Sequence, residues 1–147
     1  IDNLNDYYDV KLKKNRLKKI SLNKNFFFKN IDITNKVILN NFFKKRKIDL
    51  IIHFAAQAGV RYSLVNPKKY VDVNIHGFLN IIDQTRKNKI KNFIYASSSS
   101  VYGDSKKFPL KEDLHLNPKN IYGLSKKLNE QIAQIHSNFG ICHISIR

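Results

Sequence analysis

The fold is decided by residues 50–96, which read LIIHFAAQAGVRYSLVNPKKYVDVNIHGFLNIIDQTRKNKIKNFIYA. Two short apolar runs, Leu50–Phe54 and Asn92–Ala96, are separated by a longer amphipathic segment. Apolar runs of this length are typical of buried strands, and a helix between two of them is typical of parallel strands. Pro67 lies near the first turn of the predicted helix, which ends at about Lys87, and its missing N–H costs nothing there. The stretch therefore predicts a β–α–β unit.

The alternation of strand-length and helix-length segments continues on both sides of this unit. Ile1 reads as the end of an earlier strand, and two further apolar runs predict strands at Phe26–Ile31 and Cys142–Ile146. Strands that alternate with helices form parallel sheets covered by those helices. We therefore expect an α/β fold, an incomplete Rossmann-like doubly wound parallel sheet, with residues 1–147 as one partial domain.

Capping residues mark two more predicted helices. Thr34 is the expected N-cap of a helix from about Asn35 to Lys45. The last helix is expected from about Tyr122 to Phe139, and Gly140 follows it as a residue suited to the C′ position. These helices occupy the gaps between the predicted strands, as the fold requires.

The composition bounds the class of protein. The chain has no Met, and its ends fall within predicted strands, so we expect an internal piece of a longer protein. No apolar stretch reaches roughly 18 residues, and no signal segment opens the chain, so we expect a cytoplasmic protein without a membrane partner. The single cysteine, Cys142, cannot form an internal disulfide, and no Cys/His spacing predicts a metal site.

The formal net charge of +16 would in isolation suggest a polyanionic partner. However, 22 Lys accompany only 5 Arg, whereas bidentate phosphate recognition favours Arg, and the 18 Asn and 19 Ile fit an AT-rich genome. The densest runs, Lys11–Lys19 and Lys44–Lys47, coincide with predicted helices, where solvated faces are expected. We therefore expect no nucleic-acid partner. The alternative is a basic Rossmann-like module that binds a polyanion without catalysis.

Residues that could contact a ligand follow the predicted strands. In an open α/β sheet, ligands bind beyond the carboxyl ends of the strands. Asp2 would be the acidic residue at the end of the second Rossmann strand, which binds the adenosine ribose and favours NAD over NADP, although a solvated turn Asp is the alternative at this point. The residues after the four predicted strand ends are Asp2 and Asn3, then Asp32 and Ile33, then Ala55, Ala56 and Gln57, and finally Ser97–Ser100.

Three Tyr/Lys pairs are spaced four residues apart: Tyr7/Lys11, Tyr102/Lys106 and Tyr122/Lys126. On a helix this spacing places both side chains on one face, and a nearby ammonium favours the ionised form of a phenol, which can then act as a general base. Only the third pair opens a well-marked helix and follows a strand that ends in serines. The other two fall in a loop and at a charge-rich helix start.

Four strings together resemble the extended short-chain dehydrogenase/reductase family of NAD-dependent epimerases and dehydratases, and among them the UDP-glucuronate 4-epimerases. The resemblance covers nearly the whole chain in collinear order. The strings are IDNLNDYYDVKLKKNRL (1–17), IIHFAAQAGVRYSLVNPKKYVDVNIHGFLNII (51–82), FIYASSSSVYG (93–103) and IYGLSKKLNE (121–130).

The resemblance implies roles for individual residues. Ser98 takes the position of the catalytic serine, Tyr122 that of the base, and Lys126 that of its partner, which also binds the nicotinamide ribose. Arg61 is a candidate contact for a hexuronate carboxylate, with an ordinary surface Arg as the alternative. Asn74 has a second interpretation as a helix residue satisfied by a neighbouring backbone group. The residues at cofactor-contact positions are Asp2, Asn3, Asp32, Ile33, Ala55, Ala56, Gln57 and Asn74.

The resemblance also implies a reaction. It is the NAD-dependent 4-epimerisation of a UDP-sugar through a 4-keto intermediate, foremost UDP-glucuronate to UDP-galacturonate, with UDP-glucose as the alternative substrate. Sugar 4,6-dehydration is the alternative reaction, but dehydratases carry Asp-Glu where this chain has Ser99 and Ser100. A homodimer and a glycine-rich phosphate turn ahead of Ile1 are further expectations.

Overall fold

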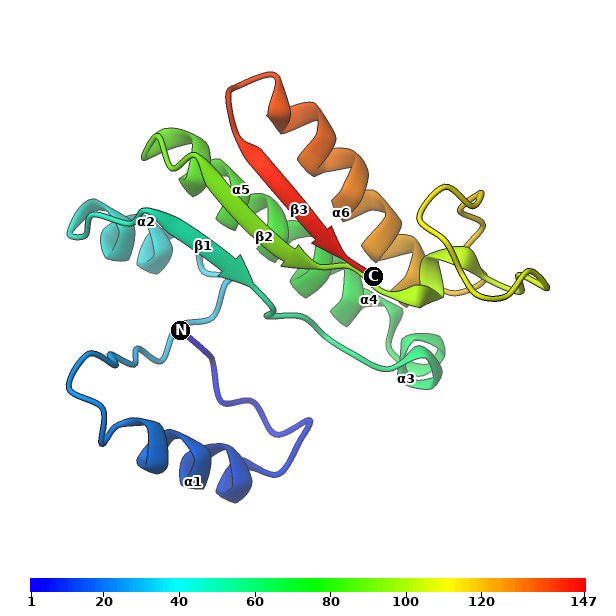
Figure 1. The fold of residues 1–147 in the computed structure, drawn as a ribbon. Helices are drawn as coiled ribbons and strands as arrows, with labels where there is room; N and C mark the ends of the chain where they lie inside the picture. The colour runs from blue at the N-terminus through cyan, green and yellow to red at the C-terminus, as the bar shows by residue number, and fades with distance from the viewer.

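The computed structural model describes all 147 residues and contains one three-stranded parallel sheet (Figure 1). The strands lie in the order β1 (Leu50–His53), β2 (Asn92–Ala96) and β3 (Cys142–Ile146). Leu50 pairs with Asn92, which in turn pairs with Cys142, so the three carboxyl ends lie along one edge. The predicted β–α–β unit and the parallel Rossmann-like arrangement are confirmed.

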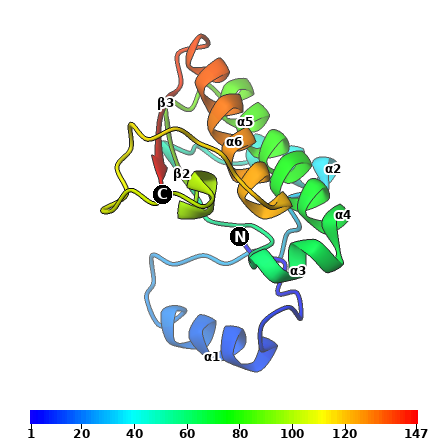
Figure 2. The same ribbon diagram turned by 90° about the vertical axis from the view of Figure 1, so that its right-hand side faces the viewer.

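The helices cover one face of this sheet, as Figure 2 shows in side view. α5 (Phe78–Lys87) and α6 (Ile121–Ser137) pack side by side across it, and α2 (Lys36–Lys44) packs against α5. Three short helices line the carboxyl edge or lead into α5: α3 (Val60–Val65), α4 (Pro67–Tyr70) and the 3-10 turn η2 (Ser99–Tyr102). Helix α1 (Val10–Ile20) lies apart from the sheet in both views.

The core lies between the sheet and its helices, and Phe78 is at its centre. Its side chain is fully buried and meets Phe93 and Tyr95 edge to face, with ring centroids 5.6 and 5.4 Å apart. His53 packs beside it at 5.5 Å and is buried in the core. Burial and the charge of Lys126 lower the pKa of His53 to about 3, so its ring is neutral.

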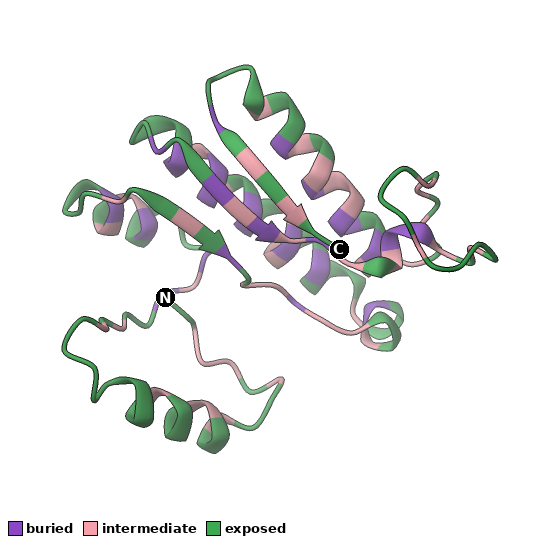
Figure 3. Ribbon diagram, in the orientation of Figure 1, coloured by how far each residue is buried: buried purple, intermediate pink, exposed green.

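The opposite face of the sheet carries no helix. Strand side chains alternate between faces, so Leu50, Ile52 and Phe54 point away from the core, together with Ile144 and Ile146 of β3. All five are exposed, which Figure 3 shows as green bands along β1 and β3. An apolar cavity beside β1, of about 390 Å³, separates this strand from Ile1 and Asp2.

Two local predictions were wrong. Phe26–Ile31 does not form a strand, because only Asn30 pairs, in a single parallel bridge with Asp2. The N-cap of α2 is Asn35, whose side chain accepts from the Ile38 N–H at 3.1 Å. Thr34 instead donates its hydroxyl to Asp32 at 2.7 Å, so the helix begins one residue later than predicted.

The long helix predicted from Pro67 to Lys87 contains a π-helical segment. After α4, residues Val71–Gly77 form η1, a π-helix that runs directly into α5. A Cβ on Gly77 would lie 2.7 Å from the Cδ1 atom of Ile33, so a glycine permits this close packing. π-Helical segments within helices frequently accompany functional sites.

The basic runs lie on solvated helix surfaces, as predicted. α1 has no buried residue and carries Lys11–Lys19, while Lys44 ends α2 and residues 45–47 follow it, all in exposed positions. Figure 3 shows α1 as almost entirely exposed. None of the helices is both long enough and apolar enough to cross a membrane.

Truncation of Phe78 tests this account of the core. In the full-length protein, Phe78→Ala should lower the free energy of unfolding by about 3–5 kcal/mol, because it leaves a cavity between the sheet and α5. Phe108→Ala is the matched control, since Phe108 is 77% exposed and its loss should cost about 0.5 kcal/mol or less. Urea titration followed by circular dichroism measures both. Equal costs for the two variants would contradict the assignment of Phe78 to the core.

Candidate active site

The candidate site lies along the carboxyl edge of the sheet. β1 continues there into Phe54–Gly59, β2 into the serine run Ser97–Ser100, and β3 into Arg147. The first turns of α6 and the buried Tyr70 approach the same edge. The structure therefore brings together segments that are up to about 90 residues apart in sequence, as expected for parallel strands.

α6 carries Tyr122 in its first turn and Lys126 one turn later. Asn120 caps the helix by accepting from the Gly123 N–H at 2.8 Å. A Cβ on Gly123 would lie 2.5 Å from the Ser100 carbonyl oxygen, so this glycine allows the helix to lie directly against the η2 turn. Sequence reasoning did not single out Gly123. Its signal is a residue that disfavours helices, placed within a helix beside the candidate base.

Lys126 is the buried cation of the site. Its residue is only 3% exposed, and its ammonium donates to the Ala96 carbonyl oxygen at 2.9 Å. Burial lowers the pKa of Lys126 to about 8. The contact joins α6 to the last residue of β2, two residues before Ser98.

Ser98 is the N-cap of η2, and its hydroxyl hydrogen is not used in any hydrogen bond within the chain. Its hydroxyl oxygen accepts from the Ser100 N–H at 3.2 Å, and it is half-buried. The hydroxyl hydrogen has no acceptor among the contacts of the chain, so it is available to a bound oxygen atom. Tyr122 is also half-buried and has no hydrogen-bond partner for its hydroxyl among the contacts of the chain.

Only one of the three Tyr/Lys pairs lies within one helix. Tyr7 precedes the start of α1 at Val10, so it does not share a helical face with Lys11. Tyr102 ends η2, and Lys106 lies in the loop beyond it. The choice of Tyr122 and Lys126 on context agrees with this geometry.

Tyr70 packs against the Tyr122 ring, and its own hydroxyl is hydrogen-bonded to backbone carbonyls. Its hydroxyl donates to the carbonyl oxygens of Ala58 and Gly59, at 2.7 and 2.5 Å, and its ring meets that of Tyr122 at a centroid distance of 6.1 Å. Burial raises the pKa of Tyr70 to about 12, so it stays a donor across the working pH range. Sequence reasoning missed this residue.

Asn74, from η1, holds the loop after β1. Its side-chain oxygen accepts from the Gln57 N–H at 2.7 Å, while its amide nitrogen donates to the Gln57 carbonyl and the Ser125 hydroxyl. The interpretation of Asn74 as a residue satisfied by neighbouring groups matches these contacts. A direct cofactor contact for Asn74 stays a prediction.

A second cavity, of about 190 Å³, lies beside the first and gathers the other predicted cofactor residues. Its walls combine carboxylate and amide groups with small and apolar side chains, and sequence reasoning missed the contribution of Tyr7, Tyr8 and Lys13. The predicted residues that line it are Asp2, Asn3, Asp32, Ile33, Ala55, Ala56 and Gln57.

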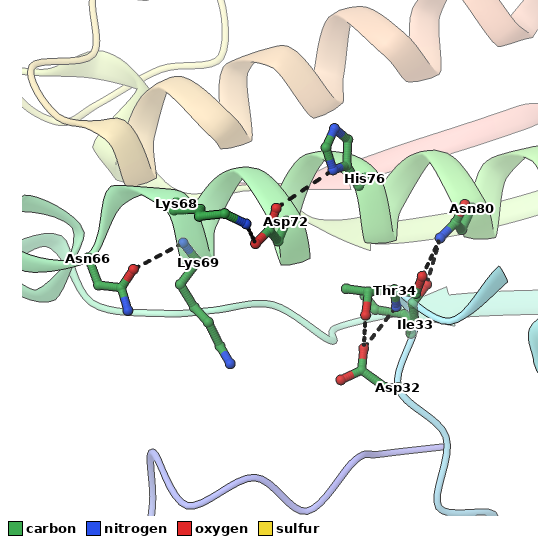
Figure 4. A network of polar contacts seen from close by, with 9 residues as sticks. All are labelled: Asp32, Ile33, Thr34, Asn66, Lys68, Lys69, Asp72, His76 and Asn80. Atoms are coloured by element: carbon green, nitrogen blue, oxygen red, sulfur yellow. Dashed lines mark hydrogen bonds and ion pairs between the residues drawn. The ribbon is translucent and has the colours of Figure 1, made fainter.

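Hydrogen bonds fix the acidic residues of this cavity. Asn3 donates to Asp32 at 3.0 Å, and Thr34 donates both its N–H and its hydroxyl to the same carboxylate (Figure 4). Partial burial opposes ionisation of Asp32, but these hydrogen bonds outweigh it and lower its pKa. Asp2 accepts from the Leu4 N–H at 2.6 Å. Figure 4 also shows Asn80 of α5 holding the backbone at Ile33 and Thr34.

Arg61 is a predicted site residue that lines neither of the two cavities and makes no hydrogen bond with another site residue. It lies in the first turn of α3 and is exposed. Both the hexuronate contact and the surface alternative remain compatible with this position.

Comparison with known proteins agrees with the fold and the motif order. Residues 2–147 match the family model described as GDP-mannose 4,6 dehydratase. "Protein CapI" of Staphylococcus aureus is 44% identical over 140 residues, which are 94% of this chain and 41% of that protein. "UDP-glucuronate 4-epimerase" of Thermodesulfobacterium geofontis is 41% identical over 147 residues, 99% of this chain and 45% of that protein.

A solved structure shows the same arrangement. The UDP-glucuronic acid 4-epimerase from Bacillus cereus, crystallised with UDP-glucuronic acid and NAD, superposes with a TM-score of 0.89 at 32% identity. The match covers 99% of this chain and 46% of that one, so the chain spans about half the length of these relatives. On the family match over nearly all its residues, the chain belongs to the NAD-dependent epimerase/dehydratase family of extended short-chain dehydrogenases/reductases.

Proposed function

We propose that the full-length protein is an NAD-dependent 4-epimerase of UDP-sugars that converts UDP-glucuronate to UDP-galacturonate. The observation that carries the proposal is the pair of contacts that hold α6, which carries Tyr122, against the segment that carries Ser98. Lys126 donates to the Ala96 carbonyl, and Gly123 lies against the Ser100 carbonyl. The cavity lined by Asp2 and Asp32 also includes Gln57, which follows β1 at the same edge. The relatives named above as UDP-glucuronate 4-epimerases support the same substrate. UDP-glucose is the alternative substrate.

The residues of the 190 Å³ cavity fit the adenosine part of NAD in their chemistry. Asp2 and Asp32 offer carboxylate acceptors for ribose hydroxyls, and the negative charge disfavours the 2′-phosphate of NADP. Ile31, Ile33 and Ala55 offer apolar surface for a purine ring. Lys126 would hold the nicotinamide ribose through the N–H groups that Ala96 does not use. The cavity itself thus offers both the carboxylate acceptors and the apolar surface that the adenosine part of NAD needs.

The proposed reaction divides the work between protein and cofactor. NAD supplies the hydride acceptor and donor. Tyr122 takes the proton of the sugar 4-hydroxyl as the C4 hydride leaves, and Ser98 donates a hydrogen bond to the same oxygen. The buried ammonium of Lys126 favours the ionised form of the phenol. The 4-keto sugar then turns in the site and takes back the hydride on its other face, while Tyr122 returns the proton to the same oxygen, which inverts C4.

The residues after Ser98 favour epimerisation over 4,6-dehydration. Loss of water across C5 and C6 requires an additional acid and base, and Ser99 and Ser100 offer neither. They instead form the first turn of η2. The description of the matching family model names a dehydratase, whereas the relatives that match over the serine run include UDP-glucuronate 4-epimerases.

Replacement of Tyr122 tests the proposed base. Tyr122→Phe keeps the ring packed against Tyr70 and removes only the hydroxyl, so turnover should fall by about 10²–10⁴-fold while bound NAD stays near wild type. Each variant is incubated with UDP-glucuronate and with UDP-glucose, and the C4 epimers are resolved by chromatography. Tyr62→Phe, which removes a nearby phenol from α3, is the matched control and should retain full turnover. Normal turnover in Tyr122→Phe with loss in Tyr102→Phe or Tyr7→Phe would overturn the assignment.

Replacement of Lys126 should affect both catalysis and cofactor retention. Lys126→Met keeps the length of the stem and removes the charge and the donors, so turnover should fall about 10²-fold or more. NAD released on denaturation should fall in the same variant. Lys87→Met on α5 is the control, because this lysine pairs only with Asp83. Full NAD content in Lys126→Met would remove the ribose contact from the proposal.

We also propose that the full-length protein is a homodimer. η1, α5 and α6 expose apolar side chains on the side that faces away from the sheet, among them Val71, Leu79 and Leu124. Light scattering at micromolar concentration should give twice the monomer mass. The double variant Leu79→Asp/Leu124→Asp should shift the protein toward monomer, because it places charges in an apolar interface. A monomeric wild-type protein would refute the proposal.

A further inference from the structure

Arg147 and Glu130 form the least exposed ion pair of the chain, and neither has a role in the reaction described above. The guanidinium donates through Nε to Oε1 at 2.9 Å and through Nη2 to Oε2 at 2.7 Å. The two side chains are 19% and 12% exposed, whereas the surface pairs on η1 and α5 are considerably more open. Bidentate Arg–carboxylate pairs fix geometry as well as charge.

Glu130 also reaches the residue before Ser98. Its Oε1 atom accepts from the Ser97 hydroxyl at 2.5 Å, and the Ser97 N–H donates to the Ile146 carbonyl at 2.7 Å. Tyr122, Lys126 and Glu130 follow one another at single-turn spacing on α6, so they share one face. Lys126 holds Ala96, and Glu130 holds Ser97. The two residues that precede Ser98 are therefore each tied to the helix that carries Tyr122.

Arg147 reaches the other end of the serine turn. Its Nη1 atom donates to the Tyr102 hydroxyl at 3.1 Å and to the Glu112 carbonyl at 2.8 Å, and the guanidinium lies 5.4 Å from the centre of the Tyr102 ring. Tyr102 is the last residue of η2, and Glu112 lies in the loop that leads to α6. The same ion pair thus holds Ser98 from both sides in sequence, through Ser97 and through Tyr102.

We propose that Glu130 and Arg147 are positioning residues that fix Ser98 relative to Tyr122, so that both hydroxyls meet one substrate oxygen. The proposal rests on the proposed function, because it assigns Ser98 and Tyr122 to the same reacting group. A pair that only stabilised the fold would need no contact with the turn that carries the serine. Here the pair contacts the residue before Ser98, Ser97, and the last residue of η2, Tyr102, and its one other side-chain hydrogen bond is to the Glu112 carbonyl in the loop after η2.

Hydrogen–deuterium exchange of the full-length protein tests the tie without a substrate. Glu130→Gln removes the charge that holds Arg147, so amide exchange should increase in peptides that cover residues 96–118. Asp83→Asn, which breaks a surface pair on α5, is the matched control and should leave these peptides unchanged. Unchanged exchange of residues 96–118 in Glu130→Gln would overturn the proposal, whatever the enzyme acts on.

A double-mutant cycle tests the effect on the serine. Glu130→Gln should lower kcat by about tenfold or more, with KM and bound NAD within about twofold of wild type, because small misplacements of reacting groups reduce rate steeply. In a Ser98→Ala background the same change should lower kcat by about twofold or less, because coupled residues are not additive. Equal losses in both backgrounds, or unchanged turnover in Glu130→Gln, would overturn the positioning role. If the wild-type protein epimerises no nucleotide sugar, the proposed function fails, and the exchange experiment still decides the tie.

Discussion

The close approach of α6 to the end of β2 is the contact on which the site depends. Gly123 lies against the Ser100 carbonyl of η2, and Lys126 donates to the Ala96 carbonyl at the end of β2. The helix therefore contacts the strand end and the turn after it at two points one helical turn apart. Neither contact tolerates much change, because the first needs a residue without a Cβ and the second a long cationic side chain. The separation between the serine turn and Tyr122 follows from these two contacts rather than from the overall sheet geometry.

This approach is opposed by the cost of burying a cation. An ammonium taken from water into a nearly closed site loses hydration, which one carbonyl acceptor replaces only in part. The lowered pKa of Lys126, and the neutral His53 beside it, are two results of the same desolvation. Buried charges of this kind occur where the charge has a function, and groups with strongly shifted pKa values cluster at functional sites.

Most of the architecture could be predicted from the sequence, because the three core strands are short apolar runs and their helices have clear ends. Phe26–Ile31 has the same apolar character but gains only one bridge, since pairing depends on a distant partner rather than on composition. The π-helical segment around Asn74 leaves no mark in the hydrophobic pattern. Within the site, the spacing alone left three Tyr/Lys pairs and helix context selected Tyr122 and Lys126, whose catalytic roles stay a prediction. Tyr70 and Arg147 make tertiary contacts that no local pattern encodes.

β1 has a free edge and a face that no helix covers, and both affect how these 147 residues behave when they are produced alone. β1 has a strand partner on one side only, so the backbone groups of its other edge are available to a foreign strand. Leu50, Ile52 and Phe54 add an apolar surface to that edge. The 147 residues produced alone should therefore stack edge to edge and precipitate.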